Sequence, residues 1–310
     1  MNLLAVGTLA FDSVETPFGM RDDVLGGSAS FTSVAASYFC PVRMVGVIGA
    51  DFPRQHLDFF RSRSIDTTGI AVLTGRTFRW RGRYEQNLNV AHTVETQLNV
   101  LSEFKPELPA AYCDSEYVFL GNIDPELQSR VLDQVRAPRF VACDTMNYWI
   151  ESNRYRTKLQ LALKRVHLLC INDAEARALS GEYNLVRAAQ AIRRMGPKHL
   201  VVKRGEHGAM LFSEEGVFAA PAYPLEQVLD PTGAGDSFAG GLMGLLARRR
   251  TTDTASLRQA VVMGSVIASF AVEDFSLDRL RRLTTVEIHE RFAKYKVLTQ
   301  FDSEGAIGWV

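Results

Sequence analysis

One stretch of the sequence brings glycines and a carboxylate together at the start of an expected helix. It reads D-P-T-G-A-G-D-S-F-A-G-G and runs from Asp230 to Gly241. Gly233 and Gly235 let successive backbone N–H groups turn toward one point. The N-terminus of a helix that starts near Gly235 adds its partial positive charge at the same place. The stretch therefore predicts an anion site.

Asp236 lies inside this anion site, where its charge would repel a phosphate. An Asp at a helix N-terminus is ordinarily a cap. The alternative is a base that accepts the proton of an incoming hydroxyl, as phosphoryl transfer requires. Two other phosphate motifs are excluded. The sequence has no G-x-x-x-x-G-K-[ST], and G-x-G-x-x-G fails because Phe238 occupies its sixth position and Pro231 interrupts any strand before it.

The composition predicts a globular protein with a local site. The chain has 310 residues, 46% of them hydrophobic, and 35 Lys and Arg balance 35 Asp and Glu. This excludes a disordered tail or a small stapled scaffold, and it gives no general attraction for nucleic acid or anionic lipid. The N-terminal apolar stretch has no basic residue before it and contains Asp12, so we expect neither a signal peptide nor a membrane segment.

The cysteines indicate a reducing compartment. Cys40, Cys113, Cys143 and Cys170 are scattered in or beside apolar runs, with no C-x-x-C pair and no His at metal-ligand spacing. We expect buried, reduced thiols in a cytoplasmic protein rather than a zinc site or disulfides.

The elements that must position the anion site alternate along the chain. Short apolar runs alternate with stretches of helical period, which is typical of βαβ units, a parallel sheet and helices on both of its faces. The last third changes character, because Gly235–Arg249 and Ala255–Val272 predict two successive helices packed as an antiparallel pair. The other expected strands are 3–7, 44–48, 117–120, 140–143, 167–171 and 200–203, and the other expected helices are 28–39, 54–63, 125–135, 174–180 and 185–195.

The stretch from Thr77 to Val100 breaks this alternation. Phe78, Trp80 and Tyr84 share one face of an expected strand, with three arginines on the other face. A small sheet inserted here would be a lid over a site, or a surface hairpin whose aromatic rings cover the main core.

The motifs resemble those of the PfkB, or ribokinase-like, family of sugar and nucleoside kinases. The stretch from Asp230 to Gly241 looks like its C-terminal signature, and Gly26-Gly27 before a helix is similar to its N-terminal di-glycine motif. Asp12 stands where the first strand of the family delivers a substrate-binding Asp. I-N-D-A-E, with Asn172 and Glu175, resembles the N-x-x-E motif. K-R-G-E-H-G, from Lys203 to Gly208, resembles the nucleotide-loop segment, and the resemblance covers roughly positions 1 to 295.

The resemblance implies one ribokinase-like kinase domain over residues 1–310, with a β lid from about 11–24 and 70–100. Amides of Gly233, Ala234 and Gly235 would form the anion hole for the transferred phosphate, and Asp236 would be the base. Glu175 and Asn172 would help to hold Mg²⁺, through water. The other implied contacts are Asp12, Gly26, Gly27 and Phe31 for the acceptor, and Asn172, Lys203, Gly205, Gly208, Thr232 and Gly235 for the nucleotide.

Several of these residues also have a purely structural interpretation. Asn172 and Glu175 fit a helix capping box, Asp12 fits a turn after the first strand, and Gly26-Gly27 fits a plain loop. The chain also departs from the family at three places. Pro53 stands where the family usually has a Gly two residues after an Asp, which concerns only helix geometry. Phe31 replaces a common Asn that contacts sugar, and Lys203-Arg204 stand where many members have a Thr.

We therefore expect an ATP-dependent, Mg²⁺-requiring kinase that phosphorylates a small polyhydroxylated molecule. Phe31 and the aromatic residues of the 77–100 stretch would form an apolar platform, which favours a ribonucleoside phosphorylated on its 5′-hydroxyl. A free sugar, a sugar acid or inositol stays open, as does a non-catalytic sensor on the same fold. A dehydrogenase is disfavoured because the glycine fingerprint is missing. We expect no nucleic-acid or membrane partner; a monovalent cation such as K⁺ and a homodimer through the lid stay open.

Overall fold

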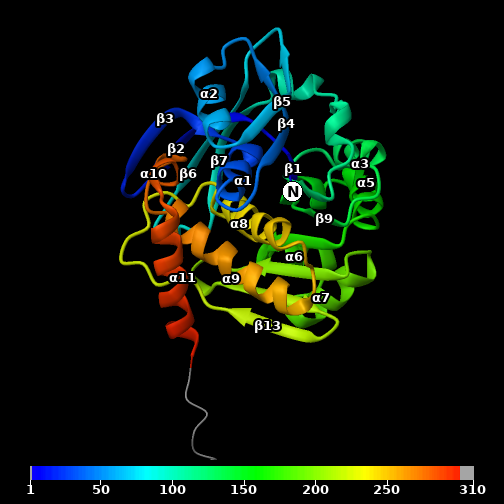
Figure 1. Ribbon diagram of the computed structural model, residues 1–310, viewed down its shortest axis with the longest axis vertical. Coiled ribbons are helices and arrows are strands. Elements are labelled where there is room, and N and C mark those ends of the chain that lie inside the picture. Colours follow the sequence, from blue (N-terminus) through cyan, green and yellow to red (C-terminus); the bar gives the residue numbers. More distant parts are fainter. Residues whose placement is uncertain (1, 301–310) are drawn as a thin grey trace, which may run out of the picture.

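The computed structural model describes residues 2–300, which form a large sheet, a small sheet and flanking helices (Figure 1). The large sheet has the order β13-β12-β11-β10-β9-β8-β1-β4-β5. Its strands are parallel apart from β12 and β13, which pair antiparallel at one edge. The bounds are β1 Leu3–Val6, β4 Val42–Gly49, β5 Ile65–Leu73, β8 Tyr117–Leu120, β9 Phe140–Cys143, β10 Leu168–Asn172, β11 His199–Lys203, β12 Ala209–Ser213 and β13 Gly216–Ala220.

Two apolar cores cover the two faces of the large sheet. One joins the sheet to α1, α2, α8, α9 and α11, and the other joins it to α3, α5, α6 and α7. Helices on both faces are therefore confirmed. The helices are α1 Ser28–Ala36, α2 Arg54–Ser62, α3 Pro125–Gln134, α4 Asn147–Glu151, α5 Asn153–Leu163, α6 Asp173–Ser180, α7 Leu185–Arg194, α8 Ala234–Arg249, α9 Thr254–Ala271, α10 Asp278–Arg282 and α11 Thr285–Thr299.

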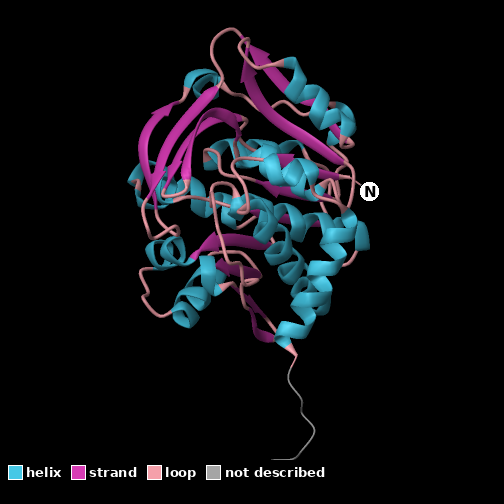
Figure 2. Cartoon of the chain, turned by 90° about the vertical axis from the view of Figure 1, so that its left-hand side faces the viewer, coloured by secondary structure: helices cyan, strands magenta, loops and turns pink. Residues whose placement is uncertain are grey.

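The small sheet, here called the lid sheet, has the order β3-β2-β6-β7 and lies beside the large sheet (Figure 2). Its strands are β2 Ala10–Thr16, β3 Gly19–Gly26, β6 Phe78–Tyr84 and β7 Ala91–Gln97. The expected start of the second lid segment at residue 70 is wrong, because residues 70–73 belong to β5, which pairs with β4 in the large sheet. The lid segment from the middle of the chain begins at Phe78.

All the strands and helices that the sequence predicts are present, with ends shifted by a few residues. The pattern missed β5, the antiparallel edge β12-β13 and the helices α4, α5, α10 and α11. The cysteines are free, and Cys113 is half-buried rather than buried. Within residues 2–300, no helix has the length and apolar character needed to span a membrane.

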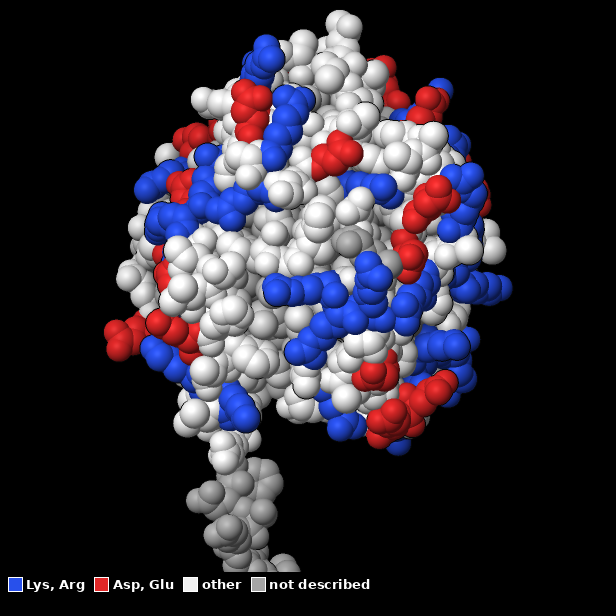
Figure 3. Space-filling model, viewed as in Figure 1, with Lys and Arg blue, Asp and Glu red and all other residues white. Residues whose placement is uncertain are grey.

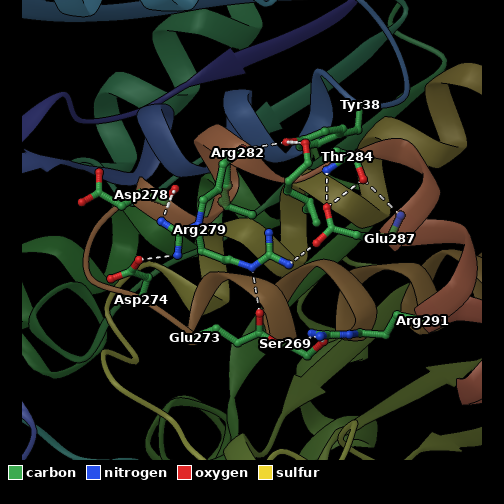
Figure 4. Close-up of polar contacts among 12 residues, drawn as sticks. Tyr38, Ser269, Glu273, Asp274, Asp278, Arg279, Arg282, Thr284, Glu287 and Arg291 are labelled. Atoms are coloured by element: carbon green, nitrogen blue, oxygen red, sulfur yellow. Dashed lines mark hydrogen bonds and ion pairs between the residues drawn. The ribbon is translucent and has the colours of Figure 1, made fainter.

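A polar network holds the last helices against α9 (Figure 4). Arg279 donates to Glu273 at 2.8 Å and to Glu287 at 2.6 Å, and Arg291 also donates to Glu273. Glu287 completes a capping box with Thr284 at the start of α11. This network fixes the connection between α9 and α10, which reaches the anion site described below.

The surface carries both signs of charge. On the face shown in Figure 3, Lys and Arg side chains form a group near the centre and further groups toward the edges, with acidic side chains between them. This distribution agrees with the neutral formal charge of the chain.

Candidate active site

The di-glycine motif shapes the junction between β3 and α1. Gly27 has φ +92°, and a Cβ there would lie 2.4 Å from the carbonyl oxygen of Thr8. A Cβ on Gly26 would lie 1.9 Å from Oδ2 of Asp12, so only glycine leaves room for that carboxylate. Thr8 and Ser28 exchange backbone-to-side-chain hydrogen bonds of 2.9 and 3.0 Å. The motif thus seats Asp12 beside the N-terminus of α1.

Asp230 fixes the loop that leads into α8. Its carboxylate accepts from the backbone N–H of Thr232 at 2.8 Å and from that of Ser276 at 3.1 Å. Ser276 in turn donates its hydroxyl to the carbonyl of Leu25 in β3. The loop and the α9–α10 connection therefore meet at one buried carboxylate, and Ser276 links them to the lid sheet.

Backbone amides without a partner gather at the start of α8, where the sequence predicts an anion hole. Gly233 has φ +75°, which an L-side chain rarely adopts. The Ala234 N–H donates to the carbonyl of Pro231 at 3.1 Å, so it is already engaged. The N–H groups of Gly233, Gly235 and Asp236 have no hydrogen-bond partner among residues 2–300. The amides left for an anion are these three, rather than the predicted set that includes Ala234.

Asp236 lies beside these free amides, in the first turn of α8. Burial raises the pKa of its carboxyl to about 7, and nearby Asp144 raises it further while Lys203 opposes the rise. Burial also raises the pKa of Asp12 to about 7, with contributions from Asp230 and Asp236. A carboxyl with a pKa near neutrality is suited to accept a proton from a hydroxyl. The predicted base and the predicted acceptor-binding Asp therefore lie in the same electrostatic neighbourhood.

Asn172 and Glu175 form the capping box of α6. The Asn172 side chain accepts from the Glu175 N–H, and the Glu175 carboxylate accepts from the Asn172 N–H, both at 2.8 Å. Burial raises the pKa of Glu175 to about 7, and Asp144 adds to the rise. The structural role is therefore confirmed, and the role toward Mg²⁺ stays a prediction. No group of three acidic, His or Cys side chains within residues 2–300 is arranged to ligate a metal directly.

Lys203 and Asp144 form a buried ion pair at the carboxyl ends of β11 and β9. The Lys203 Nζ donates to Asp144 Oδ2 at 2.8 Å, and their side chains are 17% and 8% exposed. Burial disfavours the ammonium, but the Asp144 carboxylate outweighs it and raises the pKa of Lys203. A Cβ on Gly235 would lie 2.9 Å from Nζ, so the ammonium sits over the start of α8.

Asp144 is the site residue that sequence reasoning missed. It follows β9 directly. The side-chain amide of Gln128 donates hydrogen bonds of 3.0 Å to the backbone carbonyl of Asp144 and to that of Gly121, which follows β8. A carboxylate at the end of a predicted parallel strand was the available signal, because ligands bind at that edge of open sheets.

The nucleotide loop turns sharply between β11 and β12. Gly208 has φ +83°, and its carbonyl accepts from the Arg204 N–H at 2.7 Å. A Cβ on Gly205 would lie 1.7 Å from Oδ1 of Asn89, which belongs to the connection between β6 and β7. The lid sheet therefore touches the nucleotide loop through Asn89.

The aromatic residues do not form the single platform that the sequence predicts. Phe31 is 1% exposed, and its ring lies against Gly233, where a Cβ would be 2.5 Å from it. Trp80 donates its indole N–H to Thr93 within the lid sheet at 3.2 Å. The Tyr84 hydroxyl accepts from Thr232 at 3.2 Å, which links the lid sheet to the anion site. The Phe31 ring thus packs against Gly233 in the loop from Asp230 to Gly235, here called the anion loop, and offers almost no free face.

Comparison with known proteins defines the class. The model of the pfkB family of carbohydrate kinases matches residues 11–280, so the chain belongs to this family. It is accordingly a phosphotransferase with an alcohol group as acceptor.

Three of the proteins to which this chain is similar are named as kinases of nucleosides or a riboside. The chain is 30% identical over 254 residues to a cytidine kinase of Thermococcus kodakarensis, covering 81% of this chain and 90% of that protein. A nucleoside kinase of Burkholderia thailandensis in complex with inosine has a TM-score of 0.78 at 20% identity, covering 94% of this chain and 97% of the other. The aminoimidazole riboside kinase of Salmonella enterica, with its riboside and an ATP analogue, has a TM-score of 0.75 at 20% identity, covering 94% and 100%. The ribokinase-like fold is thereby confirmed.

Proposed function

We propose that this protein is an ATP-dependent, Mg²⁺-requiring ribonucleoside kinase that phosphorylates the ribose 5′-hydroxyl. The observation that carries the proposal is the Asp236 carboxylate beside the free amides of Gly233 and Gly235. The names of the cytidine kinase and the two riboside-binding relatives support the substrate class.

The chain's own groups divide the work of in-line transfer. Asp236 accepts the proton of the attacking hydroxyl, and the free amides at the start of α8 stabilise the charge on the transferred phosphate. Asp12, seated by Gly26, binds a hydroxyl of the acceptor. The lid sheet covers the acceptor and keeps water away from the phosphate, which would otherwise be hydrolysed.

The donor set near α6 fits a hydrated Mg²⁺. Mg²⁺ prefers oxygen ligands, keeps several of its waters and is held by one or two carboxylates. Glu175 is 8% exposed and uses its carboxylate in the capping box, which leaves oxygen lone pairs for a water of that shell. Asn172 presents its side-chain oxygen beside it. When bound, the ion neutralises charge on the phosphate chain.

An acceptor panel tests the proposal. We expect ADP formation with cytidine, adenosine or inosine at a higher kcat/KM than with ribose, fructose, 2-keto-3-deoxygluconate or inositol. Asp236→Asn protein should form ADP on the order of 10²–10⁴-fold more slowly with each of them. A sugar, sugar acid or inositol that outperforms every nucleoside would remove the nucleoside assignment and keep the kinase. Acceptor binding without any ADP formation by the wild type would favour a sensor.

We also propose that two copies of the chain pair through the lid sheet. The edge strand β7 is almost wholly exposed and carries Val94 at 62% exposure, next to Val90 at 45%. Unpaired edges of this kind pair readily with a second strand. Light scattering should give the mass of a dimer, and Val94→Lys should give a monomer. A wild-type monomer at high concentration would refute the pairing.

A requirement for a monovalent cation rests on family resemblance alone. We include K⁺ in the proposal, and activity in K⁺ compared with tetramethylammonium at equal ionic strength decides it. Equal rates in the two salts would remove K⁺.

A further inference from the structure

Lys203 occupies an unusual place for a cation. Its ammonium lies over Gly235, at the N-terminus of α8, where the helix carries partial positive charge and favours anions. The neighbouring N–H groups of Gly235 and Asp236 have no partner within residues 2–300. A cation and unpaired amide donors both present positive charge, so they do not stabilise each other. An anion that lies between the ammonium and the amides would be stabilised by both.

The ammonium is also only partly satisfied. A Lys side chain has three N–H donors, and the Lys203 ammonium makes one hydrogen bond among the described residues, to Asp144. Asp144 accepts through its other oxygen from the backbone N–H of Thr145 at 2.7 Å. Two donors of the ammonium therefore remain for a further acceptor.

The surrounding carboxylates are in excess. Asp144, Glu175 and Asp236 all act on Lys203 or on each other electrostatically, so three carboxylates share one ammonium. If the ammonium turns toward an anion, Asp144 is left buried and without its partner. A buried carboxylate in that state is costly unless another cation replaces the one it lost. A divalent cation that arrives together with the anion meets this need.

We propose that Lys203 and Asp144 form an exchangeable pair: the ammonium leaves Asp144 for the terminal phosphate of the nucleotide, and Asp144 then faces the hydrated metal ion that accompanies it. Lys203 would thus be a phosphate-binding residue in its own right, and Asp144 a positioning residue for the metal, in addition to Asn172 and Glu175. The proposal rests on the proposed kinase function for the identity of the anion.

Nucleotide binding without turnover tests the first half. In titration calorimetry with Mg²⁺, Lys203→Met should weaken a non-hydrolysable ATP analogue about 10- to 100-fold relative to wild type and leave ADP nearly unchanged, because one charge-assisted hydrogen bond to the terminal phosphate is lost. Lys203→Arg should recover most of the difference. Lys198→Met is the matched control, an exposed lysine at the opposite end of β11. Equal weakening of ADP and the analogue would reduce Lys203 to a structural partner of Asp144.

A double-mutant cycle tests the exchange. In the ligand-free protein, Lys203→Met and Asp144→Asn should be non-additive in melting temperature, since the pair is formed. With the ATP analogue and Mg²⁺ saturating, this coupling should disappear. Asp144→Asn should also raise the Mg²⁺ concentration needed for analogue binding several-fold. Coupling that persists unchanged in the loaded protein would overturn the exchange.

The outcome separates this inference from the proposed function. If wild-type protein binds the analogue with Mg²⁺ but phosphorylates no nucleoside, the exchangeable pair is retained and the proposed ribonucleoside kinase function is rejected. Wild-type protein that does not bind the analogue removes both.

Discussion

At the carboxyl ends of β9 to β11 an ion pair is buried, whereas the Arg81–Asp22 ion pair of the lid sheet lies at the surface. Lys203 and Asp144 are 17% and 8% exposed, while the lid pair Arg81–Asp22 has both side chains about half exposed at 3.2 Å. Buried charges are strongly coupled and hold one geometry, and surface ion pairs contribute little. The comparison teaches that the chemistry is built into the rigid sheet and that the lid contributes cover and contacts.

The pKa shifts follow burial rather than region, because burial also raises the pKa of Asp12 in the lid strand β2 to about 7. Burial raises the pKa of Asp236 to about 7. Asp51 lies at the edge of the lid sheet, where its carboxylate accepts hydrogen bonds from Thr77 and Arg79. The hydrogen bonds from Thr77 outweigh burial and lower the pKa of this carboxyl. A change at Asp236 should therefore cost far more turnover than a change in the lid sheet away from Asp12.

The largest effect is expected for Asp236→Asn. The amide keeps the shape of the side chain but cannot accept a proton, so kcat should fall on the order of 10²–10⁴-fold while nucleotide binding persists. Steady-state kinetics and calorimetry measure the two. Asp278→Asn, an exposed Asp in the first turn of α10, serves as the control and should retain full activity. A kcat within a few fold of wild type would contradict the assignment of the base.

The pH dependence should show opposite signs for activity and stability. Asp236 must be deprotonated to act, so kcat/KM should be about tenfold lower at pH 6 than at pH 8. The pKa of Asp236 is about 7 in the folded protein and 3.8 in the unfolded chain, so the folded state binds more protons between pH 3.8 and 7. The free energy of unfolding therefore falls as the pH rises toward 7. The melting temperature of ligand-free protein should therefore rise from pH 8 to pH 6, and less so in Asp236→Asn. Parallel pH trends for rate and melting would argue against the raised pKa.

Glu175→Gln should change the metal requirement and spare the fold. Glutamine at the third helical position also closes a capping box, so α6 should keep its start. Loss of the carboxylate should raise the Mg²⁺ concentration for half-maximal rate several-fold. Glu290→Gln, at an exposed glutamate in α11, is the matched control. An unchanged Mg²⁺ titration would leave Glu175 with the capping role alone.

Much of the buried region could be predicted from the sequence, because apolar runs and turn chemistry are local signals. The glycines of the Gly26-Gly27 and Gly233–Asp236 segments indicate backbone conformations that residues with a side chain rarely adopt. The Lys203–Asp144 pair could not be foreseen, since its partners are 59 residues apart and meet only through the strand order.

Phe31 shows a second limit of the sequence. A motif places its backbone beside the anion site, but the direction of the ring depends on packing, and the ring turns under Gly233. The strand β5 was missed for a related reason. Three of its nine residues are exposed and three are half-buried at the edge of the sheet, so it lacks the continuous apolar run of a central strand.

The smallest effect is expected for Tyr84→Phe, which removes the one hydrogen bond that residues 2–300 form between the lid sheet and the anion loop. Tyr84 is 8% exposed, and its hydroxyl accepts from Thr232 at 3.2 Å. Loss of a neutral hydrogen bond costs about 0.5–1.5 kcal/mol, which corresponds to a roughly two- to tenfold change. We expect this change in KM for the acceptor with kcat retained, because the ring still packs and Asp236 is untouched. Thr232→Val removes the same bond from the other side, so the double variant should be no worse than the larger single one. A loss in kcat comparable to that of Asp236→Asn would mean that the lid takes part in the chemistry itself, and the division between the two regions would have to be abandoned.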